Sequence, residues 1–193
     1  GERAATIDIE GAIRLWSLAD DQPKLLRRWP GEGDRVVCSN IVVDSTGRAV
    51  AAVRDDSIVI LRTIDDPPGA DPMRLVAGAW RGCGVDFAPG GRWLAVSDFG
   101  GGSLWPVARE RYPYVLRGHT GVVPRLEFTP DGGRLVSVSL DGTVRQWYAR
   151  MEDLIDETCR RAFRNMTREE WERFMGGEEY RATCPDLPLL EEN

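Results

Sequence analysis

The chain has 193 residues, 42% of them hydrophobic, which is enough to bury the core of one domain with or without an appendage. Its longest apolar run, residues 41–53, is interrupted by polar residues and is shorter than the roughly 20 apolar residues that a membrane-spanning helix requires. The formal net charge is -6, and residues 1–150 carry 19 basic and 19 acidic side chains, so we expect neither a membrane segment nor a basic surface that would bind nucleic acid.

The first residues, GERAATIDIEG, contain neither the basic nor the apolar region of a secretory signal peptide. Because the chain also begins at a glycine, we expect it to be an internal piece of a longer, cytoplasmic protein. The whole excess of acidic side chains lies at the other end, since residues 151–193 carry 12 acidic and 6 basic side chains.

A pattern of the form DG-x-V-x-x-W recurs along residues 4–150. Its copies are EGAIRLW ending at Trp16, DDSIVIL at Leu61, FGGGSLW at Trp105 and DGTVRQW at Trp147. The copies are 45, 44 and 42 residues apart, and a turn followed by an apolar strand precedes each of the last three. A period of this length, built from short strands and Gly or Asp turns, predicts a β-propeller.

The last copy resembles the repeat of the WD-repeat β-propeller family, in which each repeat is a four-stranded blade. The residues that carry the resemblance are Gly118-His119, Ser137 to Ser139, Asp141-Gly142 and Trp147. The resemblance implies an all-β fold for residues 1–150, a partial propeller of about three and a half blades. A short α-helical tail over residues 151–193 completes the expected architecture.

The resemblance also implies a buried chain of hydrogen bonds within the last repeat. Its expected members are His119, Ser137 (or Ser139), Asp141 and Trp147. The physical reason is structural, because Asp-Gly makes a tight reversal and a buried imidazole and a buried indole N–H each need a partner.

The other copies depart from the family pattern. Leu61 replaces the tryptophan of the second copy, and Phe99 replaces the turn aspartate of the third, so neither can complete such a network. The last copy is short, because a helix is predicted directly after Trp147 and leaves no room for an outermost strand. We therefore expect the chain to be the C-terminal part of a larger propeller, completed by its parent protein or by another chain.

Three features resemble parts of enzymes. DFG at Asp98–Gly100 lacks the catalytic loop, phosphate loop and paired lysine of a protein kinase, and GGG at Gly100–Gly102 lacks the lysine and helix of a phosphate-binding loop. One histidine is enough for a catalytic dyad, but the Gly-His context of His119 favours a buried structural role. We expect no catalytic residue, no enzyme activity and no cofactor.

Two helices are predicted after the repeats. Apolar residues recur at helical spacing from Leu154 to Met166, with Asn165 as a left-handed stop, and a second helix runs from Arg168 to the pair Gly176-Gly177. Thr167 with Glu170 reads as a capping box, although NMT at 165–167 also matches a glycosylation sequon. The residues expected to pack against the propeller are Leu154, Phe163, Trp171 and Phe174.

The tail resembles a segment of bacterial signalling proteins that end in WD repeats. The matching residues are Leu154, Cys159, Asn165, Thr167, Glu170, Trp171, Glu178, Tyr180, Cys184 and Pro185. Many of those proteins join the propeller to a STAND-type signal-transduction ATPase or to a caspase-like or trypsin-like protease. The resemblance implies an effector outside this chain, which contains no Walker motif and no protease dyad.

The four cysteines, Cys38, Cys83, Cys159 and Cys184, show no C-x-x-C spacing, and one histidine is too few for a typical zinc site. We expect no metal and reduced cysteines, because a chain of this size can bury a core without disulfides. A Cys159–Cys184 disulfide is the alternative.

A meander of four strands per blade brings two kinds of connection to the same end of the propeller. The connections between blades supply Arg35, Trp80, Arg81 and Val122, and the turns between the second and third strands supply Arg54, Phe99 and Leu140. Aromatic residues and arginine are frequent hot spots at interfaces, so these residues are the candidate partner-binding set. The alternative is that they only pack the turns.

Three hypotheses for the function follow. The first is a non-catalytic sensor or recognition module that binds a protein partner in a signalling or defence protein. The second is a purely structural scaffold without a ligand of its own, and the third is an enzyme or an accessory part of a protease. Exposure of the candidate partner-binding residues would favour recognition over scaffolding.

Overall fold

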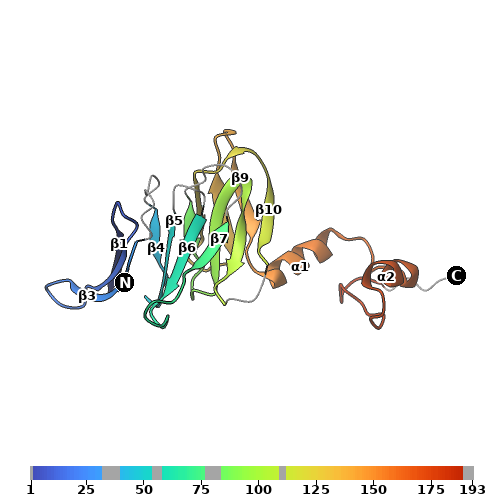
Figure 1. Ribbon diagram of the computed structural model, residues 1–193. Coiled ribbons are helices and arrows are strands. Elements are labelled where there is room, and N and C mark those ends of the chain that lie inside the picture. Colours follow the sequence, from blue (N-terminus) through green and yellow to red (C-terminus); the bar gives the residue numbers. More distant parts are fainter. Residues whose placement is uncertain (1, 32–39, 54–57, 77–83, 109–111, 189–193) are drawn as a thin grey trace. The chain divides into compact units, whose positions relative to one another are not determined.

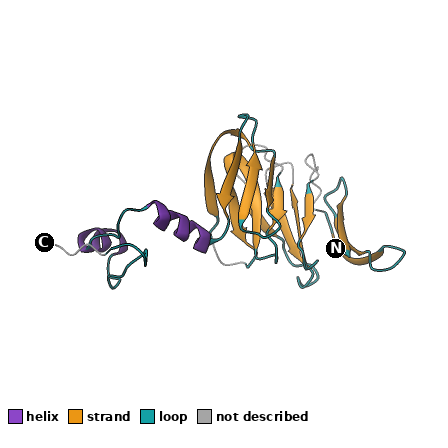
Figure 2. Cartoon of the chain, turned by 180° about the vertical axis from the view of Figure 1, so that it is seen from behind, coloured by secondary structure: helices purple, strands orange, loops and turns teal. Residues whose placement is uncertain are grey.

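A computed structural model of the chain describes residues 2–31, 40–53, 58–76, 84–108 and 112–188. Within these residues thirteen strands precede two helices (Figures 1 and 2). The chain forms two compact units, Gly1–Trp147 and Tyr148–Asn193. Neither described helix is long and apolar enough to span a membrane.

The first unit contains four antiparallel sheets, each built from strands that are consecutive in the sequence. The first two sheets are β1 (Arg3–Ile7), β2 (Ile13–Ser17) and β3 (Lys24–Trp29), then β4 (Ile41–Val43), β5 (Ala49–Val53), β6 (Ile58–Thr63) and β7 (Met73–Val76). The last two are β8 (Val85–Phe87), β9 (Trp93–Pro106) and β10 (Tyr114–Val122), then β11 (Arg125–Phe128), β12 (Arg134–Val138) and β13 (Val144–Tyr148). Figure 1 shows the sheets side by side in chain order.

Strand β9 folds back on itself. The Val107 N–H donates to the Arg92 carbonyl at 3.0 Å, so the two ends of β9 lie next to each other. Gly100, at the middle of the strand, has a φ of 85°, a left-handed conformation that glycine adopts without strain. The letters DFG at 98–100 therefore form the reversal that the repeat predicts, and the third sheet has the four strand segments of a blade.

The core lies between successive sheets, and β5 shows how the sequence builds it. The sequence of β5, AVAAV, is buried throughout because both of its faces are covered. Val50 and Ala52 pack with Leu15 of the first sheet, whereas Ala51 and Val53 pack with side chains of the third sheet. A smaller cluster, which contains Leu104 and Leu126, joins the third sheet to the fourth.

These sheets confirm the expected fold class, an all-β partial propeller with a short helical tail. The described residues form three strands in the first and last sheets and four strand segments in each of the two sheets between them. The last sheet, β11 to β13, ends without a fourth strand, as the short final repeat predicts.

The tail unit contains α1 (Met151–Arg161) and α2 (Arg168–Met175). Helix α2 has the expected bounds and capping box, with Thr167 accepting from the Glu170 N–H and Glu170 accepting from the Thr167 N–H. The prediction for α1 was wrong at its end, because the helix stops at Arg161 and the extended residue that follows it is Ala162, so Asn165 does not end the helix. Asn165 instead uses its side chain to bind a segment far along the chain.

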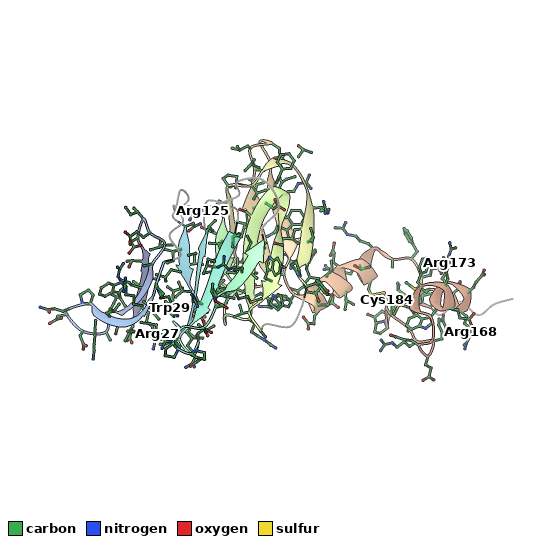
Figure 3. The ribbon with its side chains drawn as sticks, in the orientation of Figure 1. Arg27, Trp29, Arg125, Arg168, Arg173 and Cys184 are labelled. Carbon is green, nitrogen blue, oxygen red and sulfur yellow. A yellow bond between two sulfur atoms is a disulfide. The ribbon has the colours of Figure 1, made fainter. Side chains whose placement is uncertain are left out.

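The expectation of reduced cysteines was also wrong for the described pair. Cys159 of α1 and Cys184 form a disulfide, and Cys38 and Cys83 lie outside the described residues (Figure 3). The tail is small and buries few apolar side chains, so the argument that a large core replaces disulfides does not apply to it.

The tail buries Trp171 with its own residues. Its indole N–H donates to the Glu178 carbonyl at 2.9 Å, and its ring meets that of Tyr180 edge to face. The Tyr180 hydroxyl donates to the Met166 carbonyl at 2.6 Å. The packing of Leu154, Phe163 and Phe174 against the propeller stays a prediction.

Glu170 makes the tail sensitive to acid. Hydrogen bonds from Arg164 and from the Thr167 N–H lower the pKa of Glu170 from 4.5 to about 2. A carboxylate with a lowered folded-state pKa stabilises the fold above its unfolded pKa and loses this contribution as the pH falls. We expect the tail to lose stability from about pH 4.5 down to about 2, measured by the Trp171 indole N–H resonance, and Glu170→Gln to flatten this dependence. An identical acid profile in Glu170→Gln would contradict the assignment.

Candidate functional site

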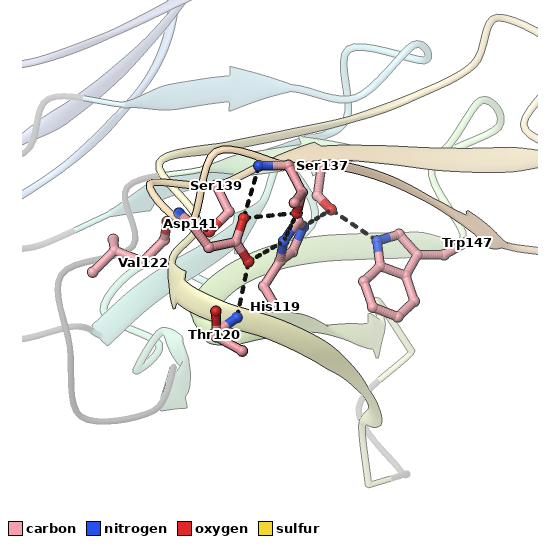
Figure 4. Close-up of polar contacts among 8 residues, drawn as sticks. His119, Thr120, Val122, Ser137, Ser139, Asp141 and Trp147 are labelled. Atoms are coloured by element: carbon pink, nitrogen blue, oxygen red, sulfur yellow. Dashed lines mark hydrogen bonds and ion pairs between the residues drawn. The ribbon is translucent and has the colours of Figure 1, made fainter.

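The network expected in the last repeat forms in the fourth sheet (Figure 4). Nδ1 of His119 lies 2.9 Å from a carboxylate oxygen of Asp141, and Nε2 lies 2.8 Å from the Ser137 hydroxyl. The Trp147 indole N–H donates to the same hydroxyl at 2.9 Å. The structure therefore brings together four residues that are up to 28 positions apart in the sequence.

Hydrogen bonds fix Asp141 as a carboxylate. It accepts from the Thr143 hydroxyl at 2.7 Å and from the N–H groups of Thr120 and Thr143 at 2.9 Å. Hydrogen bonding from the Thr143 side chain, followed by that from the Thr120 N–H, holds the pKa of Asp141 well below its usual range. An ionised Asp141 can only accept, so Nδ1 of His119 carries the shared proton.

The hydrogen bonds connect Asp141 to His119 and His119 to Ser137, as in a catalytic triad, but the Ser137 hydroxyl is buried. Ser137 is 2% exposed, and the Trp147 indole N–H already occupies one side of its oxygen. Attack on a carbonyl requires a hydroxyl that the substrate can reach. The four residues therefore link β10 to the last two strands of the fourth sheet, with the Ser137 hydroxyl buried among them.

Ser139, the alternative member, has a separate role. Its hydroxyl donates to the Val122 carbonyl at 3.0 Å and accepts from the Asp141 N–H at 3.1 Å. Ser137 is the strand hydroxyl of the network, and Ser139 ties the turn after β12 to β10.

The first repeat keeps half of the network. The Trp16 indole donates to the Thr6 hydroxyl at 3.0 Å, with the same ten-residue separation as Ser137 and Trp147. In the third repeat the residue ten positions before Trp105 is Ala95, which has no hydroxyl, and the indole donates to Ser103 instead. The network is complete only in the last repeat of the described residues.

Three of the candidate partner-binding residues lie together. Phe99 pairs with Val122 across β9 and β10, and the Leu140 N–H donates to the Val122 carbonyl at 2.9 Å. Phe99 and Leu140 are 52% and 76% exposed, and Val122 is half-buried. The other four candidates, Arg35, Arg54, Trp80 and Arg81, lie outside the described residues.

Sequence analysis missed a further residue of this kind. Ile9, in the turn between β1 and β2, is 85% exposed. It lies in the same turn of its repeat as Phe99 and Leu140 do in theirs. Ile9 is seven residues before Trp16, as Arg54 is before Leu61 and Leu140 before Trp147, and this spacing could have revealed it. We call Ile9, Phe99, Val122 and Leu140 the apolar rim.

A pocket of about 240 Å³ adjoins the apolar rim. Phe99 and Val115 contribute apolar side chains to its lining, and Arg117 and Asp98 contribute charges. Val115 of β10 is 57% exposed and lines the same pocket as Phe99. Such a surface can hold an apolar side chain of a partner, flanked by polar groups.

The described part of the chain contains no group of three or more His, Cys, Asp or Glu side chains that could hold a metal ion.

Comparison with known proteins agrees with this geometry. Residues 111–148 match the family described as WD domain, G-beta repeat. The chain is 30% identical over 148 residues to Protein HIRA of Oryza sativa subsp. japonica, which covers 76% of this chain and 14% of that protein. It is 26% identical over 164 residues to WD repeat and HMG-box DNA-binding protein 1 of Mus musculus, which covers 82% of this chain and 13% of that protein.

A solved structure, the C-terminal WD40 domain of Sif2, superimposes with a TM-score of 0.63 at 22% identity, over 77% of this chain and 40% of that one. With respect to the two curated relatives, HIRA and WD repeat and HMG-box DNA-binding protein 1, the chain spans about one seventh of their length. Residues 111–148 carry a WD40 repeat, and the all-β unit has the fold of part of a WD40 β-propeller.

Proposed function

We propose that the all-β unit is a non-catalytic recognition module that binds a protein partner through the apolar rim. The observation that carries the proposal is the exposure of a large apolar side chain in the turn between the second and third strands of three repeats, namely Ile9, Phe99 and Leu140. WD40 domains generally serve as interaction modules, which supports this function.

The energetics of the rim favour an interface. The exposed part of an apolar side chain gains no transfer free energy on folding, but it gains about 25 cal/mol per Å² of apolar surface that a partner covers. Phe99 adds an aromatic ring beside a pocket, the setting in which interface hot spots are found. An anchor from the partner would fill this pocket while the flatter parts of the rim exclude water.

The two rival functions have less support. An enzyme would need a reachable nucleophile, whereas Ser137 is sealed by Trp147. A scaffold without a ligand would use the turn residues for packing, whereas Phe99 and Leu140 leave most of their surface uncovered.

We further infer that the module serves a bacterial, cytoplasmic signalling or defence protein as its sensor, linked to a STAND-type ATPase or to a protease. The support for this setting is the resemblance of the tail, from Leu154 to Pro185, to the tails of such proteins. The partners would then include the remaining part of the propeller, since β13 has only one neighbouring strand in the described residues.

Photo-crosslinking tests where the partner binds. We expect Phe99→benzoylphenylalanine and Leu140→benzoylphenylalanine to capture the same protein from extracts of the native source. Leu18→benzoylphenylalanine is the matched control, because Leu18 is also exposed but follows β2 at the end opposite to Ile9. Equal capture at position 18, or no capture at 99 and 140, would refute binding at the rim.

A further inference from the structure

Two different attachments hold residues 183–188 in the tail. The first is covalent, the disulfide between Cys184 and Cys159 of α1. The second is Asn165, whose side-chain amide accepts from the Cys184 N–H at 2.9 Å and donates to the carbonyls of Cys184 at 3.0 Å and Leu187 at 2.6 Å. The Asn165 N–H also donates to the Pro188 carbonyl at 3.3 Å.

The two sulfur atoms of the disulfide differ in their surroundings. Cys184 is 5% exposed and lies beside the buried Asn165, whereas Cys159 is half-buried near the end of α1. Exchange requires an incoming thiolate to approach the sulfur that it attacks. The geometry therefore directs an attacking thiolate to Sγ of Cys159, with Cys184 as the leaving group.

We propose that the Cys159–Cys184 bond is a thiol–disulfide exchange site for a dithiol reductant, and that its reduction leaves residues 183–188 held by Asn165 alone. One thiolate of the reductant attacks Sγ of Cys159, and the bond breaks with its electron pair on Sγ of Cys184, which takes up a proton. The second thiol of the reductant then loses its proton and attacks the reductant's own sulfur in the mixed disulfide. Cys159 leaves and takes up a proton, so two electrons and two protons reach the cysteines and the dithiol becomes a disulfide.

Reduction removes the covalent attachment and leaves the one that Asn165 provides. The disulfide links residues 25 positions apart and so limits the conformational entropy of the unfolded tail. Breaking it raises that entropy and favours the unfolded tail. We expect the open fraction of the tail to rise on the order of 100-fold. The all-β unit, whose described residues contain no cysteine, would be unaffected.

The test uses the full chain with Cys38→Ser and Cys83→Ser, so that only the described pair remains. We expect dithiothreitol to make both remaining cysteines available for alkylation together. We also expect it to raise the rate of proteolytic cleavage within residues 176–188 by on the order of 100-fold, with no change in cleavage of residues 1–147. Cys159→Ser without reductant should reproduce this rate.

Two outcomes would overturn the proposal. One is free thiols in the chain before reductant is added, and the other is an unchanged cleavage rate after full reduction. The direction of attack has its own test with a dithiol protein that lacks its resolving cysteine. We expect mass spectrometry to find that protein joined to Cys159, and its attachment to Cys184 would refute the assigned order.

Discussion

Asn165→Ala should destabilise the tail unit by about 3 to 5 kcal/mol, the largest effect we expect from a single substitution. Asn165 is 1% exposed, and its side chain both accepts from Cys184 and donates to Cys184 and Leu187. The substitution removes these bonds and leaves the buried Cys184 N–H and carbonyl without their partner. Increased proteolytic cleavage of residues 176–188 in the oxidised full chain would measure the loss.

Arg181→Ala is the matched control for Asn165→Ala. The Arg181 side chain is exposed and makes one long ion pair, 3.8 Å from Glu178, so we expect a change within about 0.5 kcal/mol. Asn165→Asp should be nearly as damaging as Asn165→Ala, because a carboxylate cannot donate to the Leu187 and Cys184 carbonyls. Equal stability of Asn165→Ala and Arg181→Ala would contradict the role of Asn165.

His119→Ala should lower the free energy of unfolding of the all-β unit by about 2 to 4 kcal/mol. The substitution takes a buried partner from Ser137 and from Asp141 and removes the ring that meets Trp147 edge to face. Chemical denaturation followed by circular dichroism near 215 nm measures the change, since strands dominate that signal.

Thr120→Ala is the control for His119→Ala, because Thr120 is exposed and bonds Asp141 only through its main-chain N–H. We expect its effect to stay within about 0.5 kcal/mol. A loss of some hydrolytic activity in His119→Ala, with unfolding unchanged, would show that the network is catalytic and not structural.

The sequence predicted those parts of the structure that repeat. A tryptophan or leucine every 42 to 45 residues, with turns at fixed offsets, was enough to predict the sheets, and the resemblance of the last copy to the WD-repeat family implied the network of His119, Asp141 and Trp147. It did not separate Ser137 from Ser139, because residues two apart would face the same side if the strand continued through both. In the structure β12 ends at Val138, and Ser139 belongs to the turn that follows. In the first repeat the bonded hydroxyl, that of Thr6, lies ten residues before Trp16, and the residue ten positions before Trp147 is Ser137. The structure shows that Ser137 is the residue bonded to Trp147.

The parts that sequence analysis missed depend on contacts between distant residues. The role of Asn165 was missed because the residues that its side chain binds lie 19 to 23 positions away in the sequence and leave no local pattern. The Cys159–Cys184 disulfide was the alternative and not the expectation, because cysteines 25 positions apart leave no local pattern that favours a disulfide over free thiols. Ile9 was missed for a different reason, because it follows the apolar residues of β1 and reads as their continuation.

The central claim is that the apolar rim binds a protein while the buried network only holds the fold. The most direct measurement is the affinity of the combined variant Ile9→Ser, Phe99→Ser and Leu140→Ser for the partner that crosslinking identifies, together with its unfolding midpoint. We predict a loss of at least about 100-fold in affinity, since two or three hot spots contribute well over 1 kcal/mol each, with an unchanged midpoint. Leu18→Ser is the control and should keep wild-type affinity. Wild-type affinity in the combined variant as well would contradict the account.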